Sequence, residues 1–252
     1  MPLFAVMLPL STLKRIVVCS TLRNFPYLPI HCIEFAKEKL FEEQFEFGIE
    51  QYEKFRTDKP GFFEALAEMG TDEERMNAMK VVKLVAEVQK GGAVDFPACI
   101  QLAFEQMVNV FRNTIIGVIA AGDETEKSEG KPYWTGTKRK PNPLEYSPDN
   151  PMCLEYLYAA ANLYAAVFNA APCRDRVAFE EQVRRLNLAQ PEYQAAGNAA
   201  AANAAEDDEV VVDAGAKAAL ESELQGLDTE VLLKCVPHDF EKDDDDNFHI
   251  DY

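Results

Sequence analysis

The chain has 252 residues, of which 48% are hydrophobic and 27% charged, a composition typical of a globular protein with one large or two modest domains. Its 43 acidic residues outnumber the 25 basic ones and give a formal charge of −18. A field of that sign repels phosphate backbones and anionic lipid, so nucleic acid and membrane surfaces are poor candidate partners. The acidic residues are concentrated near the end of the sequence: residues 206–252 carry a net charge of −13, and the first 205 residues carry a net charge of only −5.

The first ten residues, MPLFAVMLPL, are apolar but do not have the order of a secretory signal. Lys14 and Arg15 follow the apolar run instead of preceding it, and there is no small-residue cleavage site. The run is also too short to cross a bilayer. A buried strand or a ragged terminus is the alternative for this stretch.

Helical periodicity dominates the first half of the chain. Pro29 suits the first turn of a helix that runs to about residue 45 and is expected to turn one apolar stripe inward: Ile30, Ile33, Ala36 and Leu40. Thr71 and Glu74 have capping-box spacing before a second helix, which Gly91 and Gly92 end. Its expected inward residues are Ala78, Val82, Val85 and Val88.

Three further helices are predicted. A helical stretch from Phe96 places apolar residues at spacings of three and four, and the inward set is Ile100, Phe104, Met107, Phe111, Ile115 and Val118. Asp149 or Asn150 caps a fourth helix with Pro151 at its first position and with Leu154, Leu157, Ala161 and Tyr164 inward. Asp175 opens a fifth, with Phe179, Val183 and Leu186 inward. The prediction is a mainly α domain.

The remaining stretches are read as irregular or short. Residues 131–151, KPYWTGTKRKPNPLEYSPDNP, hold too much Pro and Gly for a helix and favour a structured loop or a short hairpin. Residues 189–209 are alanine-rich and lack the large apolar side chains that offset ordering entropy, so a mobile insertion is expected. A short helix is expected near residues 214–224. The extended segment after it is predicted to leave the domain.

Familiar nucleotide and metal motifs are missing from the sequence. It contains no G-x-x-x-x-G-K-[ST], no G-x-G-x-x-G and no G-x-S-x-G. The acidic run 243–246 is read as a solvated connector, since a metal needs ligands that converge from several directions. The three histidines, His31, His238 and His249, are isolated in sequence and are expected at the surface or in the core.

The six cysteines form no C-x-x-C pair, so a zinc site is not expected. Scattered thiols are typical of a reducing, intracellular setting. Cys19 stands a few residues before a predicted helix start, where backbone N–H groups, the helix dipole and Arg23 would favour a thiolate. A thiolate there could accept an acyl group as a thioester. From the residues alone, a buried structural cysteine is the alternative.

Three ordered stretches resemble ubiquitin-activating enzymes. Residues 19–40, CSTLRNFPYLPIHCIEFAKEKL, are similar to the active-cysteine segment, a Cys-Thr-Leu-Lys/Arg-x-Phe-Pro run that leads into a helix. Residues 131–165 resemble the family's Pro-Phe-Trp-Ser-Gly-x-Lys-Arg segment and the Ala-Ala-Ala-Asn-Leu helix behind it. The end, DFEKDDDDNFHIDY, is similar to the return of the chain to the adenylation domain. The chain is thus identified as a catalytic-cysteine half-domain, mainly α with a few short extended segments.

The resemblance implies a two-step chemistry. An adenylation domain of the same parent chain, using ATP and magnesium, activates the ubiquitin C-terminus. The cysteine half-domain then takes it as a thioester and passes it to a ubiquitin-conjugating enzyme. This fragment is therefore expected to need no cofactor or metal of its own, and to be inactive alone. The family also implies a cytoplasmic and nuclear location.

One departure concerns the nucleophile. In the family pattern the cysteine stands directly before Thr-Leu-Lys/Arg, which is the position of Ser20, and Cys19 lies one residue earlier. Either Ser20 has replaced the nucleophile and would form an oxygen ester, or the register slides by one and Cys19 serves. By the same resemblance, Thr21 and Arg23 flank the nucleophile and assist transfer. Their alternative roles are a helix-entry cap and a solvated charge.

The expected organisation has five parts. They are a poorly matched segment 1–18, the helical half-domain 19–188, the mobile insertion 189–209, the end of the half-domain 210–238, and an acidic connector 239–252. The connector is expected to dock on the adenylation domain and not on this one, since Phe248, Ile250 and Tyr252 have no obvious partner. Two rival functions stay open: an activator of another ubiquitin-like protein (NEDD8 type), and a non-catalytic acidic helical interaction module.

Overall fold

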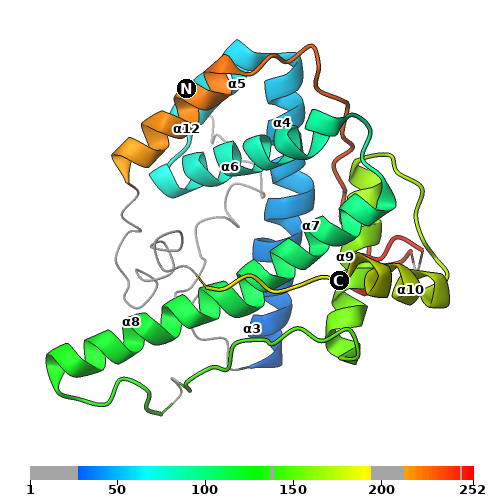
Figure 1. Ribbon diagram of the computed structural model, residues 1–252. Coiled ribbons are helices and arrows are strands. Elements are labelled where there is room, and N and C mark those ends of the chain that lie inside the picture. The colour runs from blue at the N-terminus through cyan, green and yellow to red at the C-terminus, as the bar shows by residue number, and fades with distance from the viewer. Residues whose placement is uncertain (1–27, 137–138, 194–212, 245) are drawn as a thin grey trace, which may run out of the picture.

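The computed structural model describes residues 28–136, 139–193, 213–244 and 246–252. Within those residues every regular element is a helix, which confirms the mainly α prediction. Figure 1 shows one long upright helix crossed by others, with α8 reaching away from the rest. No helix of the described part is long and apolar enough to cross a membrane.

The long helix is built from three consecutive segments: α3 (Pro29–Glu34), the π-helical η1 (Phe35–Phe47) and α4 (Gly48–Thr57). Its start at Pro29 is confirmed, but its inward face differs from the prediction. Ile30 and Ile33 are 51% and 63% exposed, and the buried side chains from Leu40 onward are Leu40, Phe41, Phe45, Ile49, Tyr52 and Phe55. Leu40 is thus buried as predicted. Ile30 and Ile33 are exposed because they belong to α3, which has no buried residue and lies beyond the end of the apolar core.

A short helix, α5 (Lys59–Glu68), follows and was not predicted. The Asp58 carboxylate caps it by accepting from the Gly61 N–H at 3.0 Å. The next helix, α6 (Asp72–Val88), begins with the predicted capping box: the Glu74 N–H donates to Thr71 Oγ1 at 3.2 Å and the Thr71 N–H to Glu74 Oε2 at 3.4 Å. A 3₁₀ turn, η2 (Gln89–Gly91), ends it before Gly92, whose φ is +98°.

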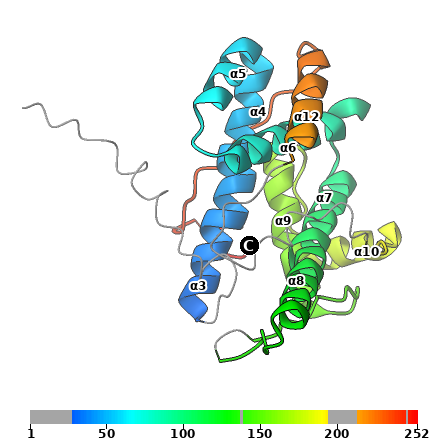
Figure 2. The same cartoon turned by 90° about the vertical axis from the view of Figure 1, so that its left-hand side faces the viewer.

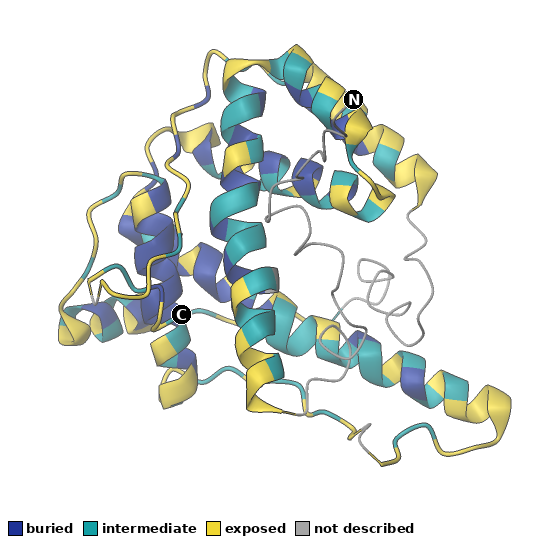
Figure 3. Cartoon of the chain, turned by 180° about the vertical axis from the view of Figure 1, so that it is seen from behind, coloured by how far each residue is buried: buried dark blue, intermediate teal, exposed yellow. Residues whose placement is uncertain are grey.

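The predicted third helix forms as α7 (Phe96–Val108), the π-helical η3 (Asn109–Asn113) and α8 (Thr114–Glu129). Ile100, Phe104 and Met107 are buried as expected, whereas Ile115 and Val118 on α8 are only partly covered. In Figure 3 α8 is coloured mainly as intermediate and exposed. The core face of this helix therefore ends near the start of α8.

The described residues between 131 and 150, which exclude 137 and 138, form irregular chain that returns along α8 and η3, and they contain no strand. Trp134 Nε1 donates to the Asp123 carboxylate of α8 at 2.9 Å, and the Leu144 N–H donates to the Phe111 carbonyl at 2.8 Å. The indole lies over Gly122, where a Cβ would be only 2.4 Å from Trp134 Cζ2. The loop alternative is confirmed, and the hairpin does not form in those residues.

The fourth and fifth helices form as predicted. Helix α9 (Pro151–Val167) is capped by Asn150, whose Oδ1 accepts from the Met152 N–H at 3.0 Å, and it is buried along most of its length (Figure 3). Helix α10 (Arg176–Leu186) is capped by Asp175, and its Phe179 and Val183 are buried. Leu186 is wrong as an inward residue, because it sits in the last turn with its side chain exposed.

Helix α12 (Ala214–Gly226) confirms the short helix expected there. It packs on α6 near the top of the molecule (Figure 2) through buried Leu220 and Leu224. An ion pair joins Glu223 to Lys83 of α6 at 2.8 Å. Lys59 of α5 donates to the carbonyl oxygens that end α12, at Gln225 (2.6 Å) and Leu227 (2.8 Å).

The residues after α12, here called the C-terminal strap (residues 228–252, of which 245 is not described), do not leave the domain. The Val236 N–H donates to the Val167 carbonyl, and the His238 N–H to the Phe45 carbonyl, each at 2.9 Å. The prediction that its apolar residues lack a partner here is wrong for Phe248 and Tyr252, which pack on the core. Ile250 is 66% exposed, as that prediction required.

A single apolar core joins the elements. Phe41, Phe45 and Tyr52 of the long helix meet α6, α7 and α9, and α7 and α9 form the most extensive helix pair. The predicted insertion 189–209 falls mostly outside the described residues. Its first residues touch the domain, since Gln190 Nε2 donates to the Leu144 carbonyl at 3.2 Å and the Pro191 carbonyl accepts from Arg112 at 3.4 Å.

Candidate functional site

All four predicted site residues, Cys19, Ser20, Thr21 and Arg23, lie outside the described residues. The structure therefore leaves the choice between Cys19 and Ser20 open. The part of the motif that is described begins at Leu28, which directly precedes the first turn of α3.

The start of α3 has the backbone geometry expected downstream of that motif. Leu28 is extended, with φ −111° and ψ 148°, and Pro29 enters the helix without needing a donor. Leu28 offers no side-chain acceptor to the first turn, so within the described residues no side-chain cap is formed there. Leu28, Ile30 and Ile33 are exposed beside this helix start. Among the described residues, the N-terminal end of the long helix thus presents exposed apolar side chains and has no side-chain cap.

The other cysteines divide into buried and accessible thiols. Burial, with a smaller contribution from Asp95, raises the pKa of Cys99 to about 12, and burial, with Glu53 second, raises that of Cys235 to about 12. Cys153 is buried as well, whereas Cys173 is half-buried and Cys32 on α3 is exposed. The buried thiols are unsuited to nucleophilic attack near neutral pH. Cys32 is an accessible thiol that the motif analysis did not single out.

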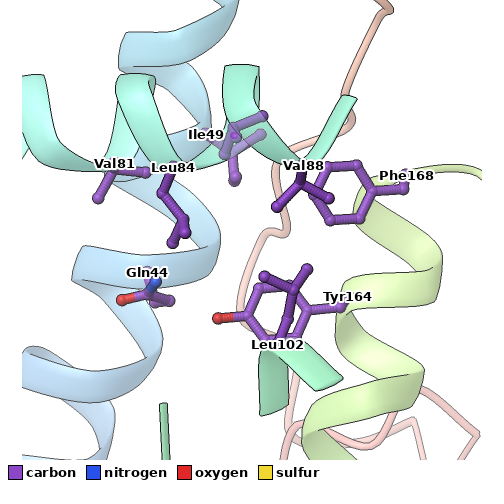
Figure 4. A pocket seen from close by; sticks show the side chains of 9 residues that line it. Gln44, Ile49, Val81, Leu84, Val88, Leu102, Tyr164 and Phe168 are labelled. Carbon is purple, nitrogen blue, oxygen red and sulfur yellow. The ribbon is translucent and has the colours of Figure 1, made fainter. Parts of the chain in front are cut away.

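The described residues include one small hollow inside the helical bundle. This hollow lies between η1, α6, α7 and α9 (Figure 4), and its walls are mostly apolar, with Val81, Leu84, Leu102 and Phe168 around it. It has room for little more than one water molecule. No group of three or more His, Cys, Asp or Glu side chains in the described part is placed to hold a metal.

The strap brings together two histidines that the sequence showed only as isolated residues. His238 Nδ1 lies 2.9 Å from His249 Nε2, and both rings pack against Phe41. The two histidines are eleven positions apart in the sequence and lie on no common helix or strand, so no periodicity could have paired them. Of the two locations expected, surface or core, His249 is buried in the core and His238 is half-buried.

Comparison with known proteins gives the family. The model of "Ubiquitin-activating enzyme, SCCH domain" matches residues 26–252. Ubiquitin-like modifier-activating enzyme 1 of Oryctolagus cuniculus is 29% identical over 253 residues, which cover 95% of this chain and 22% of that protein. Ubiquitin-activating enzyme E1 1 of Schizosaccharomyces pombe is 28% identical over 245 residues, with 95% and 23% covered.

A third relative, ubiquitin-like modifier-activating enzyme 7 of Homo sapiens, is 29% identical over 239 residues, covering 93% of this chain and 22% of that protein. The chain spans less than a quarter of the length of these relatives. The family match covers every element described above, from α3 to the strap. This chain belongs to the family of ubiquitin-activating enzyme SCCH domains, the second catalytic cysteine half-domains of those enzymes.

Proposed function

We propose that this chain is the part of a ubiquitin-activating enzyme that accepts the ubiquitin C-terminus as a thioester and passes it to a conjugating enzyme. The observation that carries the proposal is the family match over residues 26–252 together with the C-S-T-L-R-N-F-P run directly before α3. The short distance in sequence between this run and the start of α3 supports it, because the positive end of a helix dipole favours a thiolate nearby.

The transfer needs one nucleophile near that helix start. The Cys19 thiolate attacks the carbonyl carbon of the ubiquitin C-terminal adenylate, the C–S bond forms, and the C–O bond to AMP breaks. If Ser20 is the nucleophile, the same attack leaves an oxygen ester, and the hydroxyl proton must be removed. Thr21 and Arg23 flank either choice and are proposed to assist the transfer. The buried thiols Cys99 and Cys235 are not candidates.

The adenylation step is assigned to another part of the parent protein. The hollow between η1, α6, α7 and α9 is far too small for ATP, and the described residues offer no carboxylate cluster for magnesium. We therefore assign no ATP-dependent step to this chain. Its partners are proposed to be ubiquitin, a conjugating enzyme and the adenylation domain of the same parent, with the strap leading back to that domain. The scattered thiols support a cytoplasmic and nuclear location.

Ubiquitin is the proposed modifier, and another ubiquitin-like protein is the second candidate. The names of the relatives support both candidate modifiers, since two of the relatives are called ubiquitin-like modifier-activating enzymes. Offering ubiquitin and NEDD8 at equal concentration in the transfer assay below distinguishes them by the mass of the adduct.

The test is to mix the purified chain with an adenylation module of a relative, ubiquitin and Mg-ATP, and to look for a covalent adduct. A thioester on Cys19 is cleaved by dithiothreitol and disappears in Cys19→Ala but not in Ser20→Ala. An ester on Ser20 resists dithiothreitol, is cleaved by hydroxylamine and disappears only in Ser20→Ala. Cys32→Ala is the matched control, because Cys32 is an exposed thiol on the adjoining helix and its loss should leave the adduct intact.

Absence of an adduct on either residue would favour the non-catalytic interaction module. The Ser20→Cys variant distinguishes a non-catalytic module from a catalytic one whose natural nucleophile reacts poorly. If the Ser20→Cys variant forms a dithiothreitol-sensitive adduct, the surroundings of the helix start are competent and the natural residues limit the reaction. If it also stays unmodified, the thioester proposal fails for this chain.

A further inference from the structure

The two histidines of the strap belong to a continuous series of hydrogen bonds. The Glu241 N–H donates to His249 Nδ1 at 3.0 Å. His249 Nε2 lies 2.9 Å from His238 Nδ1, and His238 Nε2 lies 3.1 Å from the carbonyl oxygen of Leu163 on α9. The chain therefore runs from the strap backbone, through both rings, to the buried helix α9.

The two ends of this chain fix both tautomers. A backbone N–H can only donate, so His249 Nδ1 must be unprotonated and its proton lies on Nε2. That proton points at His238 Nδ1, which is then the acceptor. The remaining His238 proton lies on Nε2 and points at the Leu163 carbonyl, which can only accept. All four ring nitrogens are satisfied when both rings are neutral.

No position is left for one more proton. A proton on His249 Nδ1 would face the Glu241 N–H, and a proton on His238 Nδ1 would face the His249 Nε2–H. Moving the His249 proton to Nδ1 makes Nε2 an acceptor but again sets Nδ1–H against the Glu241 N–H. Every singly protonated form therefore places two donors against each other in a partly buried site.

The surroundings include few charges that could offset this. The rings of Phe41 and Phe45 from η1 cover the histidines, and α9 contributes only the Leu163 carbonyl. On the strap, Asp239 and Asp244 favour protonation of His249. The nearby groups of η1 are Lys37, whose Nζ lies 4.9 Å from the Phe240 ring, and Glu46, which accepts from the Phe240 N–H at 2.8 Å. Burial comes first among the causes that lower the pKa of both histidines.

We propose that the His238–His249 pair is an acid-sensitive latch, which holds the loop between these two residues on the helical bundle while both rings are neutral and releases it when the pair takes up a proton from solvent. The latch lies at the start of the acidic segment 239–252. Its release breaks the link from Glu241 to α9 and leaves the Val236 N–H on the Val167 carbonyl, because that bond precedes the latch.

Whether acid strengthens or weakens the latch follows from the direction of the two histidine pKa shifts. Both folded pKa values lie below the ordinary value of 6.5, so the released state binds more protons and the latch weakens as the pH falls below about 6.5. The Glu46 carboxyl acts in the opposite sense. Its folded pKa is raised, mainly by burial, so protonation of Glu46 on acidification favours the docked strap. A Glu46→Gln variant removes that opposing contribution.

The decisive measurement is made on the unmodified protein by NMR. Two-bond ¹H–¹⁵N spectra at pH 7.5 should show both imidazoles as Nε2–H tautomers, and titration should give both a pKa below 6.5. The exchange protection factor of the Glu241 amide, corrected for intrinsic rate, should fall at least about tenfold between pH 7 and pH 5. That of the Val236 amide should change by less than about threefold.

Variants test whether the pair causes the change. His249→Asn retains an oxygen near the Glu241 N–H but cannot titrate, and should abolish the pH dependence of Glu241 protection. His31→Gln, outside the latch on α3, and Glu46→Gln should both retain it. An Nδ1–H tautomer on either ring, an imidazole pKa of 6.5 or above, or Glu241 protection that stays constant while both rings titrate would overturn the proposal. These wild-type results decide the question even if His249→Asn fails to fold.

Discussion

The side chain of Gln89 pairs with the backbone of Leu233 much as two strand residues pair with each other. Its Oε1 accepts from the Leu233 N–H at 2.9 Å, and its Nε2 lies 3.3 Å from the Leu233 carbonyl. The Tyr52 hydroxyl reaches both partners, at 2.6 Å from Gln89 Oε1 and 2.9 Å from the Leu233 carbonyl. A buried polar residue at the end of α6 thus holds an extended segment that has no strand to pair with.

Replacing Gln89 with Leu should destabilise the domain by about 2–4 kcal/mol, because the Leu233 N–H and the Tyr52 hydroxyl lose a buried acceptor. Urea denaturation followed by circular dichroism measures the loss. Gln101→Leu is the matched control: Gln101 is exposed on α7 and bonds only to Glu105 among the described residues, so its loss should cost less than about 0.5 kcal/mol. Equal effects of the two variants would contradict the assigned role of Gln89.

Gly122→Ala should displace the loop over α8. Its Cβ would lie 2.4 Å from Trp134 Cζ2 and 2.7 Å from Tyr133 Cδ1, so the rings must move although alanine favours the helix by about 1 kcal/mol. Trp134 is the only tryptophan of the chain, and its emission should shift to longer wavelength as the indole becomes wetter. Gly70→Ala, whose Cβ would meet nothing closer than 3.6 Å, should leave the emission unchanged.

Thiol labelling should rank the cysteines by thiolate content and exposure. With a limiting amount of iodoacetamide, Cys19 is expected to react first and the exposed Cys32 more slowly. The pKa of about 12 makes the thiolate fraction of Cys99 roughly a thousandfold lower than that of an ordinary cysteine. Peptide mass spectrometry reads the order.

If Cys19 labels no faster than the buried Cys153, the shifted register is wrong and Ser20 occupies the catalytic position. Ser20→Cys should then create a fast-labelling site in the same peptide. The comparison with Cys32 separates activation of the Cys19 thiol from simple exposure, because Cys32 is an exposed thiol on α3.

Deleting residues 194–209 should lower the melting temperature by about 2 °C or less, because the deleted stretch offers almost no large apolar side chain to bury. The deletion begins after Tyr193 so that the contacts of Gln190 and Pro191 are kept. A loss of several degrees would mean that the stretch packs on the domain.

Local signals predicted the helices well. Three helices begin at the capping residues predicted for them, which are Thr71 with Glu74, Asn150 with Pro151, and Asp175. A cap binds N–H groups within three residues of itself, so it leaves a short pattern that can be recognised in the sequence. Helix α5 was missed since its ten residues include Pro60 and Gly61 in the first turn, which also suit a loop.

Longer-range features could not be read from the sequence. Leu40 is buried as predicted, but Ile30 and Ile33 on α3 are exposed, because the sequence does not mark where along a helix the tertiary core begins. The strap was expected to leave the domain because Phe248 and Tyr252 have no local partners. Tyr252 instead contacts Gln106 and Tyr156, far away in sequence. The nucleophile rests on sequence alone, as its segment lies outside the described residues.

The strap has a consequence for synthesis on the ribosome. Glu46 accepts from the Phe240 N–H, and Glu53 from the Cys235 N–H, across separations of 194 and 182 residues. The long helix therefore emerges before the strap and is among the last of the described helices to gain its full set of contacts. Until residues beyond 230 have been synthesised, buried polar groups such as Gln89 lack their hydrogen-bond partners. Contacts between residues so far apart in sequence also make folding slow. A nascent chain paused before the strap would be exposed to chaperones with its helices formed and one side of its core still open.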